Sequence, residues 1–150
     1  MNRLTDLFTN PFLLTSLSSW LIAQVLKVII NACIHKKLVW ERLVGDGGMP
    51  SGHSATVSSL AVITGLICGF GTFQFAVTAI FAIVVCHDAM GVRQETGKQA
   101  VMLNEIIQIL EAENIPEVKL KELVGHTPLQ VIAGILIGTA NACFMYFLVL

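Results

Sequence analysis

The sequence predicts an all-α protein in a single domain, residues 1–150, built as an integral membrane bundle of four transmembrane helices plus an amphipathic cytoplasmic helix. Two observations carry this prediction. Hydrophobic residues make up 55% of the chain and charged residues 13%, whereas soluble domains hold roughly 45–50% and about 25%. Residues 54–86 and 123–150 contain no Asp, Glu, Lys or Arg, and apolar runs of this length are typical of membrane spans.

Four spans follow one another along the chain. The first covers residues 12–34 and begins after Pro11, where a helix tolerates proline. The second covers residues 54–70, and a short Gly-Phe-Gly-Thr reversal leads into the third, residues 73–90. The fourth begins at Thr127 and Pro128, an N-cap residue followed by proline, and extends to residue 150. Each span is long enough for about 30 Å of hydrocarbon.

Between the third and fourth spans lies the one long polar stretch, residues 91–126. Four apolar residues in it recur at the spacing of a helix face, namely Leu103, Ile106, Ile107 and Leu110. This pattern predicts an amphipathic helix lying on the membrane or on the bundle. The segment Asn-Ile-Pro at 114–116 should end it, and residues 117–124 predict a second short helix.

Two pairs of glycines, Gly65/Gly69 and Gly134/Gly138, have the GxxxG spacing. This spacing permits close contact between membrane helices, and it offers faces through which a homo-oligomer could form.

The distribution of basic residues predicts the orientation. Four spans place both termini on one side and the two loops, residues 34–53 and 91–126, on the other. Arg3 lies on the terminal side and Lys27 within the first span, whereas the loops hold the remaining basic residues: Lys36, Lys37, Arg42, Arg93, Lys98, Lys119 and Lys121. The positive-inside rule therefore makes the loops cytoplasmic and both termini external, as expected in a bacterial cytoplasmic membrane.

Composition also narrows the classes of function. A net charge of −1 lacks the basic excess of a nucleic-acid-binding module, so no nucleic acid is expected as a partner. The four cysteines stand singly in apolar segments, without the spacing of a zinc site or a disulfide framework: Cys33, Cys68, Cys86 and Cys143. The sequence thus predicts no metal and no cofactor.

Polar residues at the cytoplasmic ends of the spans carry the functional prediction. Lys27 shares a helix face with Gln24 and Asn31, and a charged residue within a span costs about 2.5–3.5 kcal/mol unless it finds an anion or water. By topology Lys27 should gather with the side chains that end or begin the other spans, namely His53, Asp88, Arg93 and His126.

This set has the chemistry of a phosphate site. Lysine and arginine bind oxyanions, and the glycines before the second span let backbone N–H groups approach a ligand at a helix N-terminus. Two histidines can divide the cleavage of a phosphate ester, because one can attack phosphorus and the other can protonate the leaving oxygen. No metal is required if Lys and Arg stabilise the phosphoryl oxygens.

The segment Pro50-Ser51-Gly52-His53 resembles the second signature of the type 2 phosphatidic acid phosphatase superfamily, which also contains the vanadium haloperoxidases. More closely, the chain resembles the small divergent branch of that superfamily over residues 24–27, 47–55, 88–100 and 125–128. The resemblance implies that phosphate is held by Lys27, Ser51, Gly52 and Arg93. It also implies that His53 is the general acid and that His126 is the nucleophile.

The chain departs from the superfamily pattern in two places. Ile34 and His35 occupy the Arg-Pro positions of the first signature, where Arg42 is an alternative source of the guanidinium. In the third signature Lys119 and Leu120 replace Ser-Arg, and Gln130 replaces the aspartate that partners the histidine.

Other residues take up parts of the pattern. Arg93 is expected to supply the missing guanidinium. Asp88 either orients a histidine in place of the missing aspartate or pairs with Arg93. His35 and His87 are expected to be interfacial bystanders.

The predicted function is a membrane-bound, metal-independent phosphohydrolase that acts on a lipid phosphate monoester through a phosphohistidine. Phosphatidic acid, phosphatidylglycerol phosphate and isoprenyl phosphates all fit, with membrane lipids as the other partners. The alternative is a non-catalytic lipid-phosphate binder or transporter that keeps the anion pocket, which Gln130 favours because an amide cannot stabilise an imidazolium as a carboxylate does.

Overall fold

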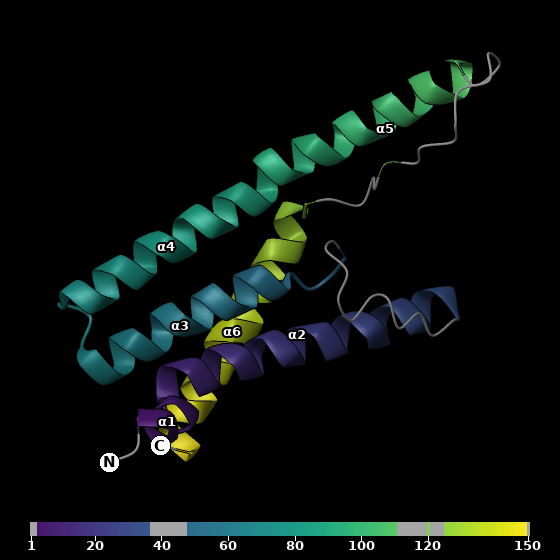
Figure 1. Cartoon of the computed structure of the whole chain (residues 1–150). Coiled ribbons are helices and arrows are strands. Elements are labelled where there is room, and N and C mark those ends of the chain that lie inside the picture. The colour runs from purple at the N-terminus through teal and green to yellow at the C-terminus, as the bar shows by residue number, and fades with distance from the viewer. Residues whose placement is uncertain (1–2, 37–47, 111–119, 121–124, 150) are drawn as a thin grey trace.

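A computed structural model describes residues 3–36, 48–110, 120 and 125–149 of the chain. Within these residues the secondary structure is helical, with no strand, which confirms the all-α prediction. Figure 1 shows the helices in chain order: α1 (Arg3–Phe8), α2 (Pro11–His35), α3 (Gly52–Cys68), α4 (Phe73–Met90), α5 (Val92–Leu110) and α6 (Pro128–Leu148).

Helices α2, α3, α4 and α6 coincide with the predicted spans to within a few residues. Three helical runs among the described residues are long and apolar enough to cross a membrane, namely Pro11–Ile34, Phe73–Ile109 and Pro128–Leu148. Helix α3 is also apolar but shorter, at 17 residues. The structure is therefore that of a helical membrane bundle.

Side-chain caps fix where the spans begin. Asn10 accepts hydrogen bonds from the N–H groups of Phe12 and Leu13, with Pro11 in the first turn of α2. Thr127 and Gln130 form a reciprocal capping box at the start of α6. Each cap satisfies backbone donors that a helix leaves unpaired in its first turn.

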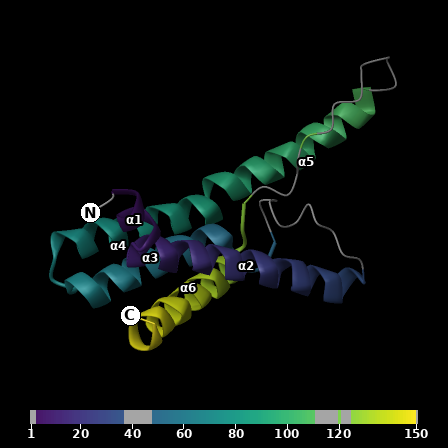
Figure 2. The same cartoon turned by 60° about the horizontal axis from the view of Figure 1, so that its bottom comes forward.

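The four spans alternate in direction, and both chain termini lie at the same end of the bundle in both views (Figures 1 and 2). Helix α3 is central, because it packs against α2, α4 and α6. The segments that precede α3, follow α4 and precede α6 accordingly lie together at the end of the bundle remote from the termini.

Glycines allow α6 to approach α3 closely. A Cβ atom at Gly134 would overlap the carbonyl oxygen of Ser51, and one at Gly138 would overlap the carbonyl oxygen of Ala55 and Oγ of Ser58. Both glycines of this GxxxG pair are thus used within one chain. A homo-oligomer stays a prediction and would need a different surface.

Helix α5 begins directly after Gly91, continues the direction of α4 and projects beyond the rest of the bundle (Figures 1 and 2). Of the predicted apolar face, Leu103 and Ile106 are exposed and Ile107 is half-buried, whereas the side chain of Leu110 lies outside the described residues. Its main contacts with the other described helices are with α4, the helix that it continues, and its placement on the membrane or on the bundle stays a prediction. The predicted helix end at residues 114–116 and the short helix at 117–124 fall outside the described residues, apart from Leu120.

Candidate phosphate site

Backbone hydrogen bonds join three separate segments at the end of the bundle remote from the termini. The N–H of Ser51, just before α3, donates to the carbonyl oxygen of Gln130 in α6 at 3.0 Å. The N–H of His126 donates to the carbonyl oxygen of Ala89 in α4, also at 3.0 Å. Since backbone groups make these contacts, the sequence pattern gave no signal for them beyond the shared end of the spans.

Gly125 explains how His126 reaches α4. Its φ is +91°, and a Cβ atom at this position would overlap the backbone of Arg93 and Gln94. Only glycine combines this left-handed conformation with so close an approach. The segment before α6 is therefore held against the junction of α4 and α5, which brings His126 next to the Asp88–Arg93 stretch.

The imidazole of His126 is 4% exposed, and its Nδ1 lies 3.1 Å from Oε1 of Gln130. The same Oε1 accepts a hydrogen bond from the N–H of Thr127 at 3.1 Å. An N–H can only donate, so this amide atom is the oxygen, and Nδ1 of His126 must be the protonated nitrogen. In the neutral form of the ring, Nε2 is then the nitrogen that carries the lone pair.

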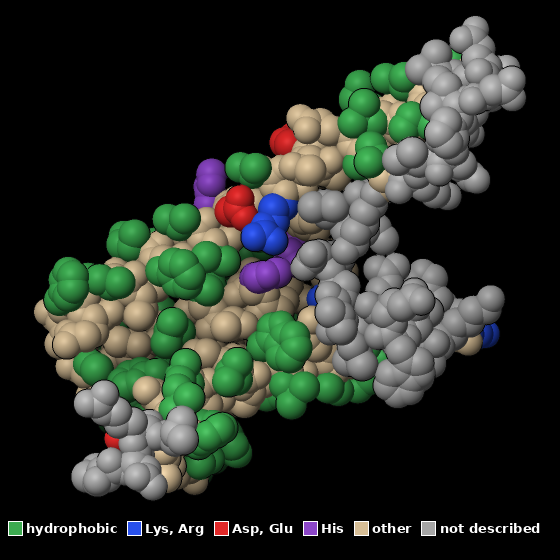
Figure 3. All heavy atoms as spheres, viewed as in Figure 1, with side chains coloured by type: hydrophobic (Ala, Val, Ile, Leu, Met, Phe, Trp, Pro, Cys, Tyr) green, Lys and Arg blue, Asp and Glu red, His purple; other side chains and the backbone are tan. Residues whose placement is uncertain are grey.

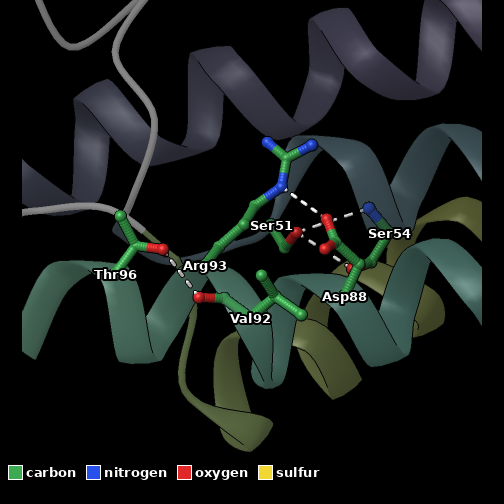
Figure 4. Close-up of polar contacts among 6 residues, drawn as sticks. All are labelled: Ser51, Ser54, Asp88, Val92, Arg93 and Thr96. Atoms are coloured by element: carbon green, nitrogen blue, oxygen red, sulfur yellow. Dashed lines mark hydrogen bonds and ion pairs between the residues drawn. The ribbon is translucent and has the colours of Figure 1, made fainter.

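Ser51 is fully buried and caps α3. Its Oγ accepts hydrogen bonds from the N–H of Ser54 at 3.3 Å and from Oγ of Ser54 at 2.9 Å (Figure 4). The hydroxyl proton of Ser51 is thus not used in either bond. Gly52 and His53 follow in the first turn of α3, where helix N–H groups point toward an incoming anion. Gly52 is buried and His53 is exposed.

Helix α2 turns its polar face toward this segment. Lys27 is only 4% exposed, and its Cγ and Cδ lie 3.6 Å from the position of a Cβ at Gly48. The carboxamide carbon of Gln24 lies 3.7 Å from the corresponding position at Gly52. The buried Lys27 therefore packs beside Gly48, just before α3, and Gln24 packs beside Gly52 in its first turn.

Asp88 and Arg93 form an ion pair across the break between α4 and α5, with Arg93 Nε 2.6 Å from Asp88 Oδ2. Figure 4 shows the guanidinium pointing away from its own helix, and Figure 3 shows basic, acidic and histidine side chains gathered at this part of the surface. One of the two roles expected for Asp88, the pairing with Arg93, is present in the structure, and the orienting of a histidine stays a prediction.

The remaining candidates are His87, Arg42 and His35. The side chain of His87 is exposed on α4 and lines a groove described below. Arg42 and the side chain of His35 lie outside the described residues. Among the side chains that the structure describes, no three of His, Cys, Asp and Glu are grouped as metal ligands, and the four cysteines are free.

An apolar groove of about 540 Å³ runs along the bundle between α3, α4 and α6. Phe70 and Phe75 lie at the end near the α3–α4 turn, whereas His87 and Met90 lie at the end near Asp88 and Ala89. The groove therefore extends from the polar cluster into the membrane-spanning part of the bundle.

A helical membrane bundle with a buried lysine, an arginine, two histidines and close-packed glycines at one end defines a membrane protein with a candidate oxyanion site. The chain belongs to the Divergent PAP2 family, whose model matches residues 8–141. It is 41% identical over 145 residues to the "Uncharacterized membrane protein YuiD" of Bacillus subtilis (strain 168), covering 89% of this chain and 92% of that protein. No solved structure matches the chain.

Proposed function

We propose that the protein is a phosphohydrolase that removes phosphate from a lipid phosphate monoester, with His126 as nucleophile and His53 as general acid. The observation that carries the proposal is the hydrogen bond between Nδ1 of His126 and Oε1 of Gln130. Because Oε1 of Gln130 accepts the hydrogen bond of Nδ1–H, the neutral imidazole has its lone pair on Nε2. A nucleophilic histidine needs this tautomer.

The reaction has two steps. In the first, the Nε2 lone pair of His126 attacks phosphorus, the P–O ester bond breaks, and the leaving oxygen takes a proton from His53. In the second, water attacks the phosphohistidine, neutral His53 takes a proton from the water, and the P–N electron pair returns to His126. Phosphate is released and both histidines regain their starting protonation states.

The phosphoryl oxygens are bound by Lys27, by Arg93 and by the backbone N–H groups at the start of α3. Their positive charge offsets the negative charge of those oxygens, which is the role a metal ion plays in other phosphatases. Burial of Lys27 supports this role, because a lysine removed from water is stabilised by an anion. The ion pair with Asp88 holds the guanidinium of Arg93 near the junction of α4 and α5.

The groove supports a lipid rather than a water-soluble substrate. Most of the residues that line the groove are apolar. Its end at Met90 lies beside Ala89, whose carbonyl oxygen accepts the hydrogen bond from the N–H of His126. A hydrocarbon chain lying in the groove would place its phosphate at the polar cluster. With the orientation that the basic loops favour, the substrate phosphate lies at the cytoplasmic face of the membrane.

A non-catalytic lipid-phosphate binder or transporter is the second candidate, and Gln130 favours it, since an amide stabilises a cationic imidazole less well than a carboxylate does. Phosphate release from a panel of lipid phosphates by the purified protein in detergent separates the two. We expect turnover that survives EDTA and is lost in His126→Ala. Binding of lipid phosphate without turnover on any substrate would instead support the binder.

A further inference from the structure

Gln24 is a buried side chain whose hydrogen-bonding capacity is not used. It is 6% exposed, and its Oε1 is completely buried with no hydrogen-bond partner in the structure. A buried acceptor without a donor is destabilising, and such groups are rare in folded proteins. The unused oxygen therefore indicates a donor that arrives with a ligand.

The position of Gln24 indicates which ligand. Its carboxamide carbon lies 3.7 Å from the position of a Cβ at Gly52, at the N-terminus of α3. Gln24 also precedes Lys27 by three residues, and residues three apart share one face of a helix. Lys27 packs against Gly48 in the same segment. The unused acceptor therefore faces the region proposed to hold phosphate.

A hydrogen-bond acceptor is unexpected in a site that binds an anion, because the oxygens of the anion are themselves acceptors. Lys27, Arg93 and backbone N–H groups are donors that bind unprotonated oxygens, and a sulfate would satisfy them as well as a phosphate. The two anions differ in one respect: inorganic phosphate keeps a P–OH proton at neutral pH, and sulfate has none. A neutral amide oxygen can accept a hydrogen bond from this P–OH group. Unlike a carboxylate, it carries no negative charge that would repel the anion.

We propose that Gln24 is the specificity-determining residue of the site: its Oε1 accepts the hydrogen bond of a P–OH group, so that the site takes phosphate, and phosphate monoesters in their singly protonated form, in preference to sulfate and its esters. The proposal rests on the proposed function, because it assumes that an oxyanion binds between α2 and the start of α3. It adds the way in which the protonated oxygen is recognised.

The test is the affinity of the purified full-length protein for inorganic phosphate and for sulfate, measured by calorimetry at one pH and one ionic strength. We expect the wild-type protein to prefer phosphate. Gln24→Leu should weaken phosphate binding roughly 2- to 12-fold, as for the loss of one neutral hydrogen bond. It should leave sulfate binding unchanged, so the preference is lost. Gln24→Met, which keeps the length of the side chain, should behave in the same way if the leucine variant folds poorly.

A matched control comes from the same helix. Thr15 is also buried, and its Oγ1 also lacks a hydrogen-bond partner, but it lies nine residues away, about 13 Å along the helix axis. Thr15→Val and Gln24→Leu should both raise Tm, because each removes an unsatisfied buried group. Only the Gln24 variant should change the preference between the anions.

The outcomes separate this proposal from the function it rests on. A wild-type protein that binds both anions equally, or Gln24 variants that keep the wild-type preference, would overturn the role of Gln24 and leave the phosphohydrolase proposal intact. A wild-type protein that binds neither phosphate nor sulfate would overturn both. A loss of preference in Thr15→Val as well would show a general effect of α2 and would also overturn it.

Discussion

The Nδ1 atom of His126 and the Oε1 atom of Gln130 lie 3.1 Å apart, and that oxygen also completes the capping box of α6. One side chain therefore both starts the fourth span and sets the tautomer of the proposed nucleophile. Because this partner of the His126 ring is an amide and not a carboxylate, it orients the ring without placing a negative charge beside it.

Restoring that charge should increase activity. Gln130→Glu keeps the cap, because glutamate serves at this position of a capping box. A carboxylate stabilises the cationic phosphohistidine better than an amide does, so kcat/KM should rise roughly 5- to 12-fold, the difference between a charged and a neutral hydrogen bond. Gln130→Met should lower both kcat/KM and the stability of α6. A glutamate variant slower than the methionine variant would contradict this role for Gln130.

The cations of the site should dominate anion binding. Lys27→Ala or Arg93→Ala should weaken the binding of vanadate roughly 10- to 150-fold, as expected for the loss of one charge-assisted contact. Lys98→Ala is the matched control, because Lys98 is an exposed lysine of α5 paired with Glu95. Vanadate affinity that survives both site substitutions would place the anion elsewhere.

The close approach of α6 to α3 should tolerate no side chain. Gly138→Leu would force an isobutyl group against Ala55 and Ser58, so the free energy of unfolding should fall by about 1–3 kcal/mol or more. Since α6 carries Gln130, which binds the backbone of Ser51, anion binding should fall with it. Gly71→Ala is the control, because a Cβ there meets nothing within 4 Å, and its stability should match wild type.

Charge distribution and apolar length were enough to predict the spans, because a membrane helix must carry its signal in a continuous run of residues. That the segments before α3, after α4 and before α6 meet at one end of the bundle also followed from topology, since span ends alternate between the two membrane faces. The continuation of α4 into α5 in one direction could not be predicted in this way. Gly91 reads as the end of a span, yet the backbone after it stays helical and its direction continues.

The partners of individual side chains were harder to predict. Whether Asp88 pairs with Arg93 or with a histidine depends on the path of the chain at Gly125, and that path is set by a backbone contact with Arg93 and Gln94. The unused acceptor of Gln24 was likewise invisible in the sequence, because only packing shows whether a buried amide has found a donor.

The orientation in the membrane can be tested by cysteine labelling in a background without the four native cysteines. The excess of basic residues in the loops predicts that a cysteine replacing Lys98 is labelled from the cytoplasm. Both termini lie at the opposite end of the bundle, so a cysteine replacing Thr5 should be labelled from outside. Labelling of both positions from one side would contradict the odd number of crossings, by α2, α3 and α4, that the structure places between α1 and α5.

The division of labour between the histidines is tested most directly by trapping the phosphoenzyme. After incubation with a labelled lipid phosphate and alkaline quenching, which preserves phosphohistidine, we expect the label on His126 of the wild-type protein and no label in His126→Ala. His53→Ala should slow turnover by roughly 10²- to 10⁴-fold, with a smaller loss on an aryl phosphate whose leaving group needs no proton. Label on His53, or label that persists in His126→Ala, would contradict His126 as the nucleophile.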